Sequence, residues 1–250
     1  MIGLIGSGNM ARALVRGWGE PVLCTDLLPE RAEALAAEVG GEAVASGAEL
    51  AQRADLVVLC HKPAGLQDVA GEIAGHARGI VSILGATPLA KVKAAYPGVP
   101  VVRILPSTPV EVRRGVCCHA RDPEADPAFE AQVLELFGRV GPVVTLDEAL
   151  IDAAMGLMSC APAYLAVVAE AQIDAGVRRG LAADVATQLV LGTMGGTAAL
   201  LEHRGGDTLR VRREVTSPGG STARGLDALE RNNLRTAFSD ALDAVLDGGR

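Results

Sequence analysis

The chain opens with Met1-Ile-Gly-Leu-Ile-Gly6-Ser7-Gly8-Asn9-Met10-Ala11, and this stretch decides the fold. Apolar residues 2–5 predict a buried strand, and the pattern G-x-G-x-x-A that follows leads into an amphipathic helical segment. In this context Gly6 permits a tight turn, Gly8 lets a pyrophosphate approach the backbone, and Ala11 is small enough for a helix to lie against a sheet. We therefore expect a dinucleotide-binding turn, although a plain glycine turn between strand and helix is the alternative. The expected cofactor-binding residues of this turn are Gly6, Ser7, Gly8, Asn9, Met10 and Ala11.

An acidic residue stands at the spacing that such a site requires. Asp26 follows a second predicted strand, where a carboxylate accepts hydrogen bonds from both ribose hydroxyls. The same carboxylate repels a 2′-phosphate, which favours NAD over NADP. Arg31, in the next predicted helix, could reach that phosphate, so NADP stays open. The structural alternative for Asp26 is a turn or capping role before Pro29.

The first two thirds of the chain alternate short apolar runs with helical segments. The predicted strands cover residues 2–5, 22–25, 56–60, 79–84, 99–105, 115–120 and 143–145. This alternation predicts an α/β fold with a mainly parallel, doubly wound sheet of the Rossmann type. Beyond this part the chain predicts Ala-rich helices interrupted at residues 176–180, 205–207 and 217–220. We expect a dinucleotide-binding domain over residues 1–147 and a smaller all-α C-terminal domain over residues 148–250.

Composition excludes several classes of function. The 250 residues suffice for two domains, and the net charge of −7 argues against a nucleic-acid partner. Five cysteines without a C-x-x-C pair suit a reducing compartment, no metal site is predicted, and a first strand at Ile2 leaves no signal peptide. We expect a cytoplasmic protein. The uncharged stretches 153–169 and 185–201 are interpreted as buried helices of a soluble bundle and not as membrane spans, because charged residues flank them closely.

A second cofactor contact is predicted at Cys60-His61-Lys62-Pro63, where a strand ends. Ligands of open α/β sheets bind at the carboxyl ends of the strands, which favours Lys62 and Pro63 as cofactor-binding residues. Pro63 is expected at the first position of the next helix. His61 invites interpretation as a general base, but a structural role is favoured for a single histidine at a strand end.

With these motifs placed, the chain resembles the pyrroline-5-carboxylate reductase family along its full length. The motifs that carry the resemblance are residues 6–11, Lys62-Pro63, Arg103-Ile-Leu-Pro106-Ser107-Thr108-Pro109, Ala161-Pro162-Ala163-Tyr164, residues 170–177, and Val215-Thr216-Ser217-Pro218-Gly219-Gly220-Ser221-Thr222. The resemblance implies reduction of the cyclic imine pyrroline-5-carboxylate to proline by NADH or NADPH. It also implies a cofactor contact at Ser107 and a homodimer or higher homo-oligomer formed through the C-terminal domain.

The resemblance further implies that residues Ser217, Gly219, Gly220, Ser221 and Thr222 hold the carboxylate of an imino-acid substrate. Thr222 is then the catalytic residue, with a hydrogen bond to the ring nitrogen. Elementary chemistry agrees, because two glycines can turn N–H groups inward at the start of a helix over residues 223–231. We expect both Gly219 and Gly220 to adopt backbone angles open mainly to glycine. A P-G-G turn with a Ser or Thr N-cap is the alternative.

The chain departs from the family at two places. Ser159-Cys160-Ala161 stands where the family has G-S-G, and Ser107 stands where it has Asn. These changes leave the exact substrate and the choice of NADH or NADPH open. The alternatives are a related reductase of another imine or carbonyl acid, and a non-catalytic regulatory protein that keeps the fold.

Overall fold

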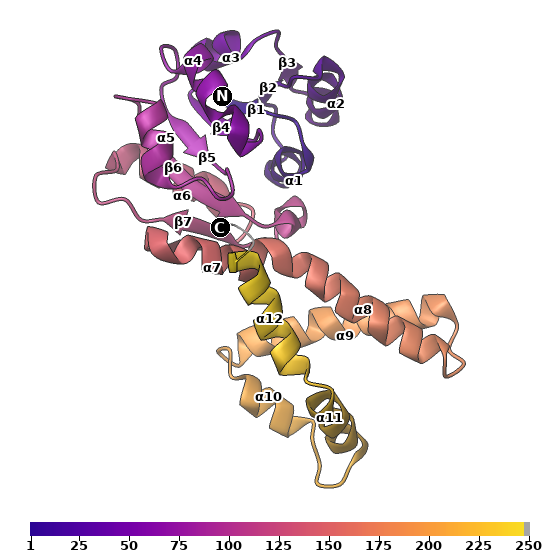
Figure 1. The fold of residues 1–250 in the computed structure, drawn as a ribbon. Helices are drawn as coiled ribbons and strands as arrows, with labels where there is room; N and C mark the ends of the chain where they lie inside the picture. Colours follow the sequence, from indigo (N-terminus) through magenta and orange to yellow (C-terminus); the bar gives the residue numbers. More distant parts are fainter. Residues whose placement is uncertain (248–250) are drawn as a thin grey trace. The chain divides into compact units, whose positions relative to one another are not determined.

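The computed structural model describes residues 1–247, which contain the helices and strands labelled in Figure 1. The first part comprises β1 (Ile2–Ile5), α1 (Asn9–Trp18), β2 (Leu23–Thr25), α2 (Pro29–Val39), β3 (Glu42–Ala43), α3 (Gly47–Arg53), β4 (Leu56–Leu59), η1 (Pro63–Gly65), α4 (Leu66–Ile73), β5 (Ile80–Ser82), α5 (Leu89–Ala95), β6 (Val101–Pro106), η2 (Thr108–Val112), β7 (Cys117–Ala120), α6 (Pro127–Gly138) and β8 (Val143–Leu146). Helical elements then follow without a strand up to residue 247: η3 (Glu148–Leu150), α7 (Ile151–Met155), η4 (Gly156–Cys160), α8 (Ala161–Val177), α9 (Ala183–His203), α10 (Thr208–Glu214), α11 (Ser221–Arg231) and α12 (Leu234–Asp247).

The strands form one sheet in the order β3-β2-β1-β4-β5-β6-β7-β8. All neighbouring pairs are parallel except β6 and β7, which are antiparallel. The predicted doubly wound, mainly parallel sheet is therefore confirmed. The two-residue strand β3 was not predicted, because so short a segment has no apolar period to detect.

Helices cover both faces of this sheet, because the side chains of a strand alternate between its faces. Leu4 of β1 belongs to a core with α1, α2 and α6, whereas the adjacent Ile5 belongs to a core with α3, α4 and α5. Cys117 and Cys118 of β7 divide in the same way between two clusters. Burial on both faces explains why the strands are continuous apolar runs.

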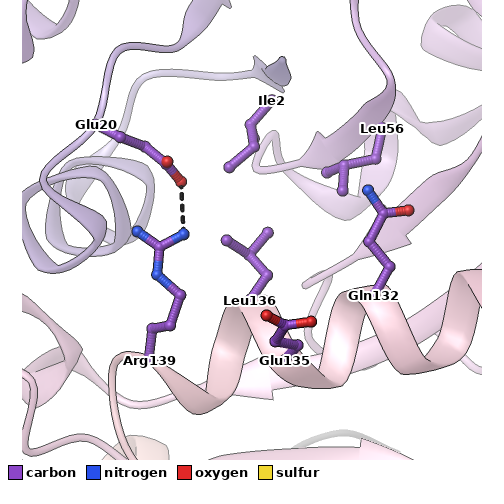
Figure 2. Close-up of a pocket in the computed structure, with 7 residues that line it drawn as sticks. All are labelled: Ile2, Glu20, Leu56, Gln132, Glu135, Leu136 and Arg139. Carbon is purple, nitrogen blue, oxygen red and sulfur yellow. Dashed lines mark hydrogen bonds and ion pairs between the residues drawn. The ribbon is translucent and has the colours of Figure 1, made fainter.

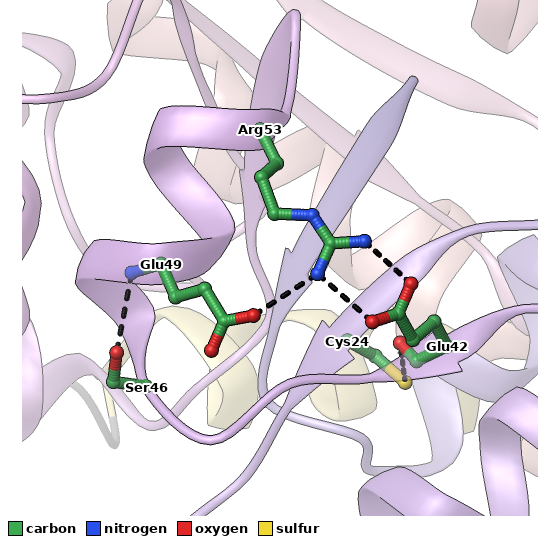
Figure 3. Close-up of polar contacts among 5 residues, drawn as sticks. All are labelled: Cys24, Glu42, Ser46, Glu49 and Arg53. Carbon is green, nitrogen blue, oxygen red and sulfur yellow. Dashed lines mark hydrogen bonds and ion pairs between the residues drawn. The ribbon is translucent and has the colours of Figure 1, made fainter.

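Charged side chains cover the edge of the sheet at β3 (Figure 3). Arg53 at the end of α3 donates to both carboxylate oxygens of Glu42, at 2.8 and 2.5 Å, and to Glu49 at 3.0 Å. This guanidinium lowers the pKa of Glu42. The Ser46 hydroxyl caps α3 by accepting from the N–H of Glu49 at 3.2 Å. Such charges at an exposed edge oppose pairing with a strand of another chain.

A buried ion pair attaches the first helices after β8 to the sheet. Arg103 of β6 is 2% exposed, and its Nη1 donates to Oε1 of Glu148 in η3 at 2.6 Å. The same oxygen accepts from the N–H of Leu89 in α5 at 2.8 Å. Ile151 and Met158 add apolar contacts to this attachment. The chain accordingly divides into two compact units after Pro162, whereas the helical part begins directly after Asp147.

The unit that begins at Ala163 buries few of its apolar side chains. In its two longest helices, α8 and α9, only Ala169 and Ala186 are buried. The interpretation of residues 153–169 and 185–201 as buried helices is therefore wrong for most of their residues in the single chain, although Met158, Ala169 and Ala186 are buried. The helical stretch Glu148–Val177 is, among the described residues, long and apolar enough by length and composition alone to cross a membrane.

Candidate functional site

Gly6 forms the turn between β1 and α1, and two observations show why it is glycine. Its φ is +98°, a left-handed conformation that side chains disfavour. A Cβ at this position would also lie 2.8 Å from the carbonyl carbon and oxygen of Cys60 and from the nitrogen of His61. The turn is fixed by a 2.8 Å bond from the N–H of Gly6 to the carbonyl of Thr25. The turn at Gly6 therefore lies close to the residues that follow β4, the strand that neighbours β1 on its other side.

The N-terminus of α1 has the chemistry of an anion site. Gly8 is the N-cap without a side-chain hydrogen bond, and the first turn has no acidic residue. The N–H groups of residues 9–11 therefore lack a capping acceptor, and they lie at the positive end of the helix. No atom is within 4 Å of a Cβ built on Gly8, so the backbone is open to a ligand. Ala11 is 1% exposed and packs in the core, as expected.

The carboxylate of Asp26 lies against this turn. Its Oδ2 accepts from the N–H of Ser7 at 2.6 Å, and its Oδ1 accepts from the N–H of Leu28 at 3.0 Å. The bond to Leu28 shows the turn role that was the structural alternative. The bond to Ser7 places a negative charge beside the glycine turn, as a ribose-binding role requires. The two interpretations are therefore compatible.

Lys62, Pro63 and Ser107 lie at the ends of β4 and β6, on the same edge of the sheet as Gly6. Lys62 is exposed, and Pro63 begins the short helix η1 at its first position, as predicted. Ser107 is 3% exposed, and its hydroxyl accepts from the N–H of Val116 at 2.8 Å. The backbone of Ser107 is bonded as well, because its N–H donates to the carbonyl of Val116 at 3.0 Å and its carbonyl accepts from the N–H of Val110 at 3.1 Å. The hydrogen of the hydroxyl remains available as a donor, so the expected cofactor contact at Ser107 stays a prediction.

His61, which follows β4, has one ring nitrogen with a partner and, within residues 1–247, one without. Its Nδ1 lies 2.8 Å from the carbonyl oxygen of Lys62, which can only accept, so Nδ1 carries the hydrogen. Its Nε2 is buried and has no partner among the described residues. Burial lowers the pKa of His61, because it disfavours the charged imidazolium. His119 of β7 likewise has a lowered pKa because of burial, and it contacts Thr145 and Glu130.

The predicted substrate loop contains a tight turn before α11. The N–H of Gly220 donates to the carbonyl of Ser217 at 3.0 Å, with Pro218 and Gly219 between them. Gly219 has φ +68°, as a type II turn requires at this position. Gly220 has φ −71° and ψ 177°, so the expectation of glycine-only angles is wrong there. A Cβ at Gly220 would lie 2.5 Å from Oγ of Ser217, a side chain that can rotate away, and 3.1 Å from the carbonyl oxygen of Ser217, which is a tight contact with the backbone.

Helix α11 begins at Ser221, two residues earlier than expected from the sequence. Its first turn contains no acidic residue, and its N-cap Gly220 provides no side-chain acceptor. Within residues 1–247 no capping side chain accepts from the N–H groups of residues 221–223, and Ser221 and Thr222 are exposed. This arrangement fits a carboxylate. The alternative of a Ser or Thr N-cap is wrong, because the N-cap is Gly220, whereas the P-G-G turn of that alternative is present.

The stretch that departs from the family pattern forms an unusual local structure. Residues Gly156–Cys160 (η4) form a π-helix, a rare conformation that is frequent at functional sites. The hydroxyl of Ser159 donates to the carbonyl of Pro106, at the end of β6, at 3.3 Å. No sequence signal predicted this π-helix, because it depends on contacts with the sheet.

The hollow in Figure 2 lies elsewhere. It has a volume of about 240 Å³ and is lined by the first residues of β1 and β4, Ile2 and Leu56, and by residues of α6. An ion pair of 3.0 Å between Arg139 and Glu20 borders it. It is thus at the amino edge of the sheet, away from the glycine turn. Residues 1–247 contain no group of three or more His, Cys, Asp or Glu side chains that could hold a metal ion.

The comparisons with known proteins agree with this geometry. Residues 148–250 match a family profile described as pyrroline-5-carboxylate reductase dimerisation, and residues 1–85 match one described as NADP oxidoreductase coenzyme F420-dependent. The pyrroline-5-carboxylate reductase of Corynebacterium melassecola is 32% identical over 98% of this chain and 96% of its own length. The one of Thermus thermophilus is 34% identical over 98% and 95%. The crystal structure of the Plasmodium falciparum pyrroline carboxylate reductase with NADP bound has a TM-score of 0.89 and 25% identity, covering 99% of this chain and 96% of that one.

The Rossmann-type sheet, the glycine turn and the acidic residue after β2 define a dinucleotide-dependent oxidoreductase with a helical C-terminal part. The full-length similarity then gives the particular family. The chain belongs to the pyrroline-5-carboxylate reductase family.

Proposed function

We propose that this protein reduces the cyclic imine pyrroline-5-carboxylate to proline with NADH or NADPH, the last step of proline biosynthesis. The observation that carries the proposal is the turn of residues 217–220 followed by three N–H groups of α11 without a capping acceptor. A carboxylate is the substrate group that such donors and the positive helix end bind. The named relatives act on a substrate with this group.

In this proposal each part of the loop has its own task. Residues Ser217, Gly219, Gly220 and Ser221 hold the substrate carboxylate. The hydroxyl of Thr222 donates to the ring nitrogen as the nitrogen gains electron density, which lowers the barrier because the bond strengthens during reduction. No Asp, Lys or His in the recognised motifs is an evident general acid, so the proton arrives with the iminium form of the substrate or through water.

The cofactor residues in the proposal are Gly6, Ser7, Gly8, Asn9, Met10, Ala11, Asp26, Lys62, Pro63 and Ser107. When bound, the reduced nicotinamide supplies the hydride. The left-handed Gly6, the open backbone at Gly8 and the uncapped start of α1 fit its pyrophosphate. Asp26 lies beside this turn and would accept from the ribose hydroxyls.

We also propose a soluble, cytoplasmic homodimer or higher homo-oligomer that assembles through residues 148–250, with residues 1–147 as the dinucleotide-binding domain. Two observations support this. The profile that matches residues 148–250 is described as a dimerisation domain, and α8 and α9 expose large apolar residues in the single chain. The exposed residues are Leu165, Val167, Val177, Val185, Leu189 and Leu191.

Steady-state oxidation of NADH and NADPH tests the proposed activity, with pyrroline-5-carboxylate as the varied substrate. We expect substrate-dependent oxidation and formation of proline in equal amount. Oxidation without proline, or none with either cofactor, would contradict the proposal.

A related reductase of another imine is the second candidate. The observation that favours it is the π-helix at residues 156–160, which contains Ser159 and Cys160 of the departure from the family pattern. Comparing kcat/KM for imines of different ring size under the same conditions decides between them, because the preferred substrate has the highest value.

A further inference from the structure

Arg224 lies one turn into α11, directly behind the turn of the substrate loop. Its Nη1 donates to the carbonyl oxygen of Gly219 at 2.8 Å. The side chain is exposed, and no described ion pair uses its charge. Neither packing nor an ion pair therefore explains why this flexible side chain is hydrogen-bonded to a carbonyl of its own loop.

With the bond from Arg224, both polar groups of the peptide between Gly219 and Gly220 are hydrogen-bonded. The peptide between Gly219 and Gly220 has its N–H on the carbonyl of Ser217, at 3.0 Å, and its carbonyl on Arg224. With both ends bonded, this peptide cannot rotate without breaking a hydrogen bond. Its orientation sets the start of α11, because Gly220 is the N-cap of that helix.

The orientation of this peptide matters for an anion at the loop. A type II turn needs the positive φ of Gly219, and glycine also populates many other conformations. In several of them the Gly219 carbonyl oxygen would turn toward the anion and repel it. A cation that holds this oxygen opposes that rotation and adds positive charge near the helix start.

We propose that Arg224 is a positioning residue for the substrate carboxylate, which it serves by holding the Gly219 carbonyl so that the N–H groups of residues 221–223 remain free for the anion. The inference rests on the proposed function of residues 217–222. Arg224 lies outside the motif of residues 215–222. We assign it a role in substrate binding and none in the reduction step.

The test compares Arg224→Met with Arg224→Lys, which keeps the charge and one donor. Arg231→Met is the matched control, because Arg231 is an exposed arginine at the other end of the same helix. All variants are full-length chains assayed at saturating NADH. We expect Arg224→Met to raise KM for pyrroline-5-carboxylate about three- to tenfold with kcat within about twofold of wild type, since one charge-assisted hydrogen bond is removed. Arg224→Lys should recover most of the loss, and NADH binding by fluorescence titration should not change.

Amide hydrogen exchange of the peptide that spans residues 215–224 gives a second measurement, which does not depend on turnover. Exchange should be faster in Arg224→Met than in wild type and unchanged in Arg231→Met, because only the first variant frees the Gly219–Gly220 peptide. Unchanged exchange and KM in Arg224→Met overturn the proposal, and so does an equal rise of KM in both methionine variants, which would be an effect of net charge alone. If wild type fails to reduce pyrroline-5-carboxylate, the proposed function fails, and the exchange measurement still decides whether Arg224 orders the loop.

Discussion

Asp26 combines a structural role and a predicted functional one in a single carboxylate. Both its oxygens accept backbone N–H groups, from Ser7 in the glycine turn and from Leu28 before α2. These bonds fix the charge at the place where a ribose 2′-substituent is expected. The residue therefore orders the turn, and we predict that its charge discriminates between the two cofactors.

The charge of Asp26 should make wild type prefer NADH over NADPH. Asp26→Ala should narrow the ratio of the two kcat/KM values by about tenfold, since it removes both the ribose acceptor and the repulsion of the 2′-phosphate. Asp26→Asn, which keeps an acceptor for one N–H group, separates the effect of the charge from loosening of the turn. Glu33→Gln, an exposed position on α2, is the control for general charge. A strong preference of wild type for NADPH would show that the assignment of Asp26 is wrong.

Thr222 should affect turnover and not cofactor binding. Thr222→Ala removes one hydrogen bond, worth about 1 to 3 kcal/mol, so kcat and kcat/KM should both fall on the order of 10- to 100-fold. Thr222→Ser should keep most of the activity, because it retains the hydroxyl. Gly220→Val should instead weaken substrate binding, because its Cβ would displace the Ser217 hydroxyl and crowd the Ser217 carbonyl in the turn. Steady-state kinetics together with an NADH-binding titration distinguish effects on turnover, substrate binding and cofactor binding. Unchanged turnover in Thr222→Ala would exclude the Thr222 hydroxyl from the mechanism.

At the scale of elements, the attachment of η3 to the sheet depends on one buried cation. Arg103 lies on β6 with 2% exposure, and Glu148 is its closest carboxylate. Glu148 also caps the start of α5 through the N–H of Leu89. A single side chain thus joins β6, α5 and η3.

Glu148→Ala should lower the free energy of unfolding by about 2 kcal/mol, because it leaves the buried Arg103 charge with only the more distant carboxylate of Asp152, at 3.9 Å, and the Leu89 N–H without its acceptor. Asp147→Ala is the matched control, since Asp147 pairs with Arg121 at 3.4 Å on the surface and should change the free energy by less than about 0.5 kcal/mol. Urea denaturation at one fixed protein concentration measures both variants. Equal effects of the two substitutions would mean that burial of Arg103 does not govern this attachment.

At the scale of the whole molecule, α8 and α9 require an apolar partner that the single chain does not supply. Leu165 of α8 and Leu189 of α9 are each more than half exposed. Several large exposed apolar residues on two helices are typical of an interface in soluble proteins. A second copy of the chain meets the requirement, because an isologous contact buries the same surface twice.

Light scattering at micromolar concentration should therefore find a dimer or a larger homo-oligomer. Leu189→Glu should shift the protein toward the monomer, because association would bury an unpaired charge. Val112→Glu is the control, since Val112 is 68% exposed in η2 of the sheet unit. A monomeric wild type would contradict the assembly, as would dissociation by Val112→Glu to the same extent.

Features that depend on residues close together in the chain could be predicted before the fold was known. The sequence predicted the strands β1, β2 and β4 to β8, the turn at Gly6, and the helix breaks near Gly180, Gly205 and Gly219, because apolar period and glycine are local signals. The spacing from the glycine turn also singled out Asp26 as the candidate ribose-binding residue. The substrate loop was found through the resemblance, and its site roles remain predictions.

Tertiary structure decided the features that depend on residues distant in the chain. The antiparallel pairing of β6 with β7 and the pairing of Arg103 with Glu148 require the completed sheet. The ordinary φ of Gly220 follows from its place as N-cap of α11, and the exposure of α8 and α9 follows from what the rest of the chain leaves uncovered. Local propensity does not determine which partner a side chain meets, because that depends on register and packing across the whole fold.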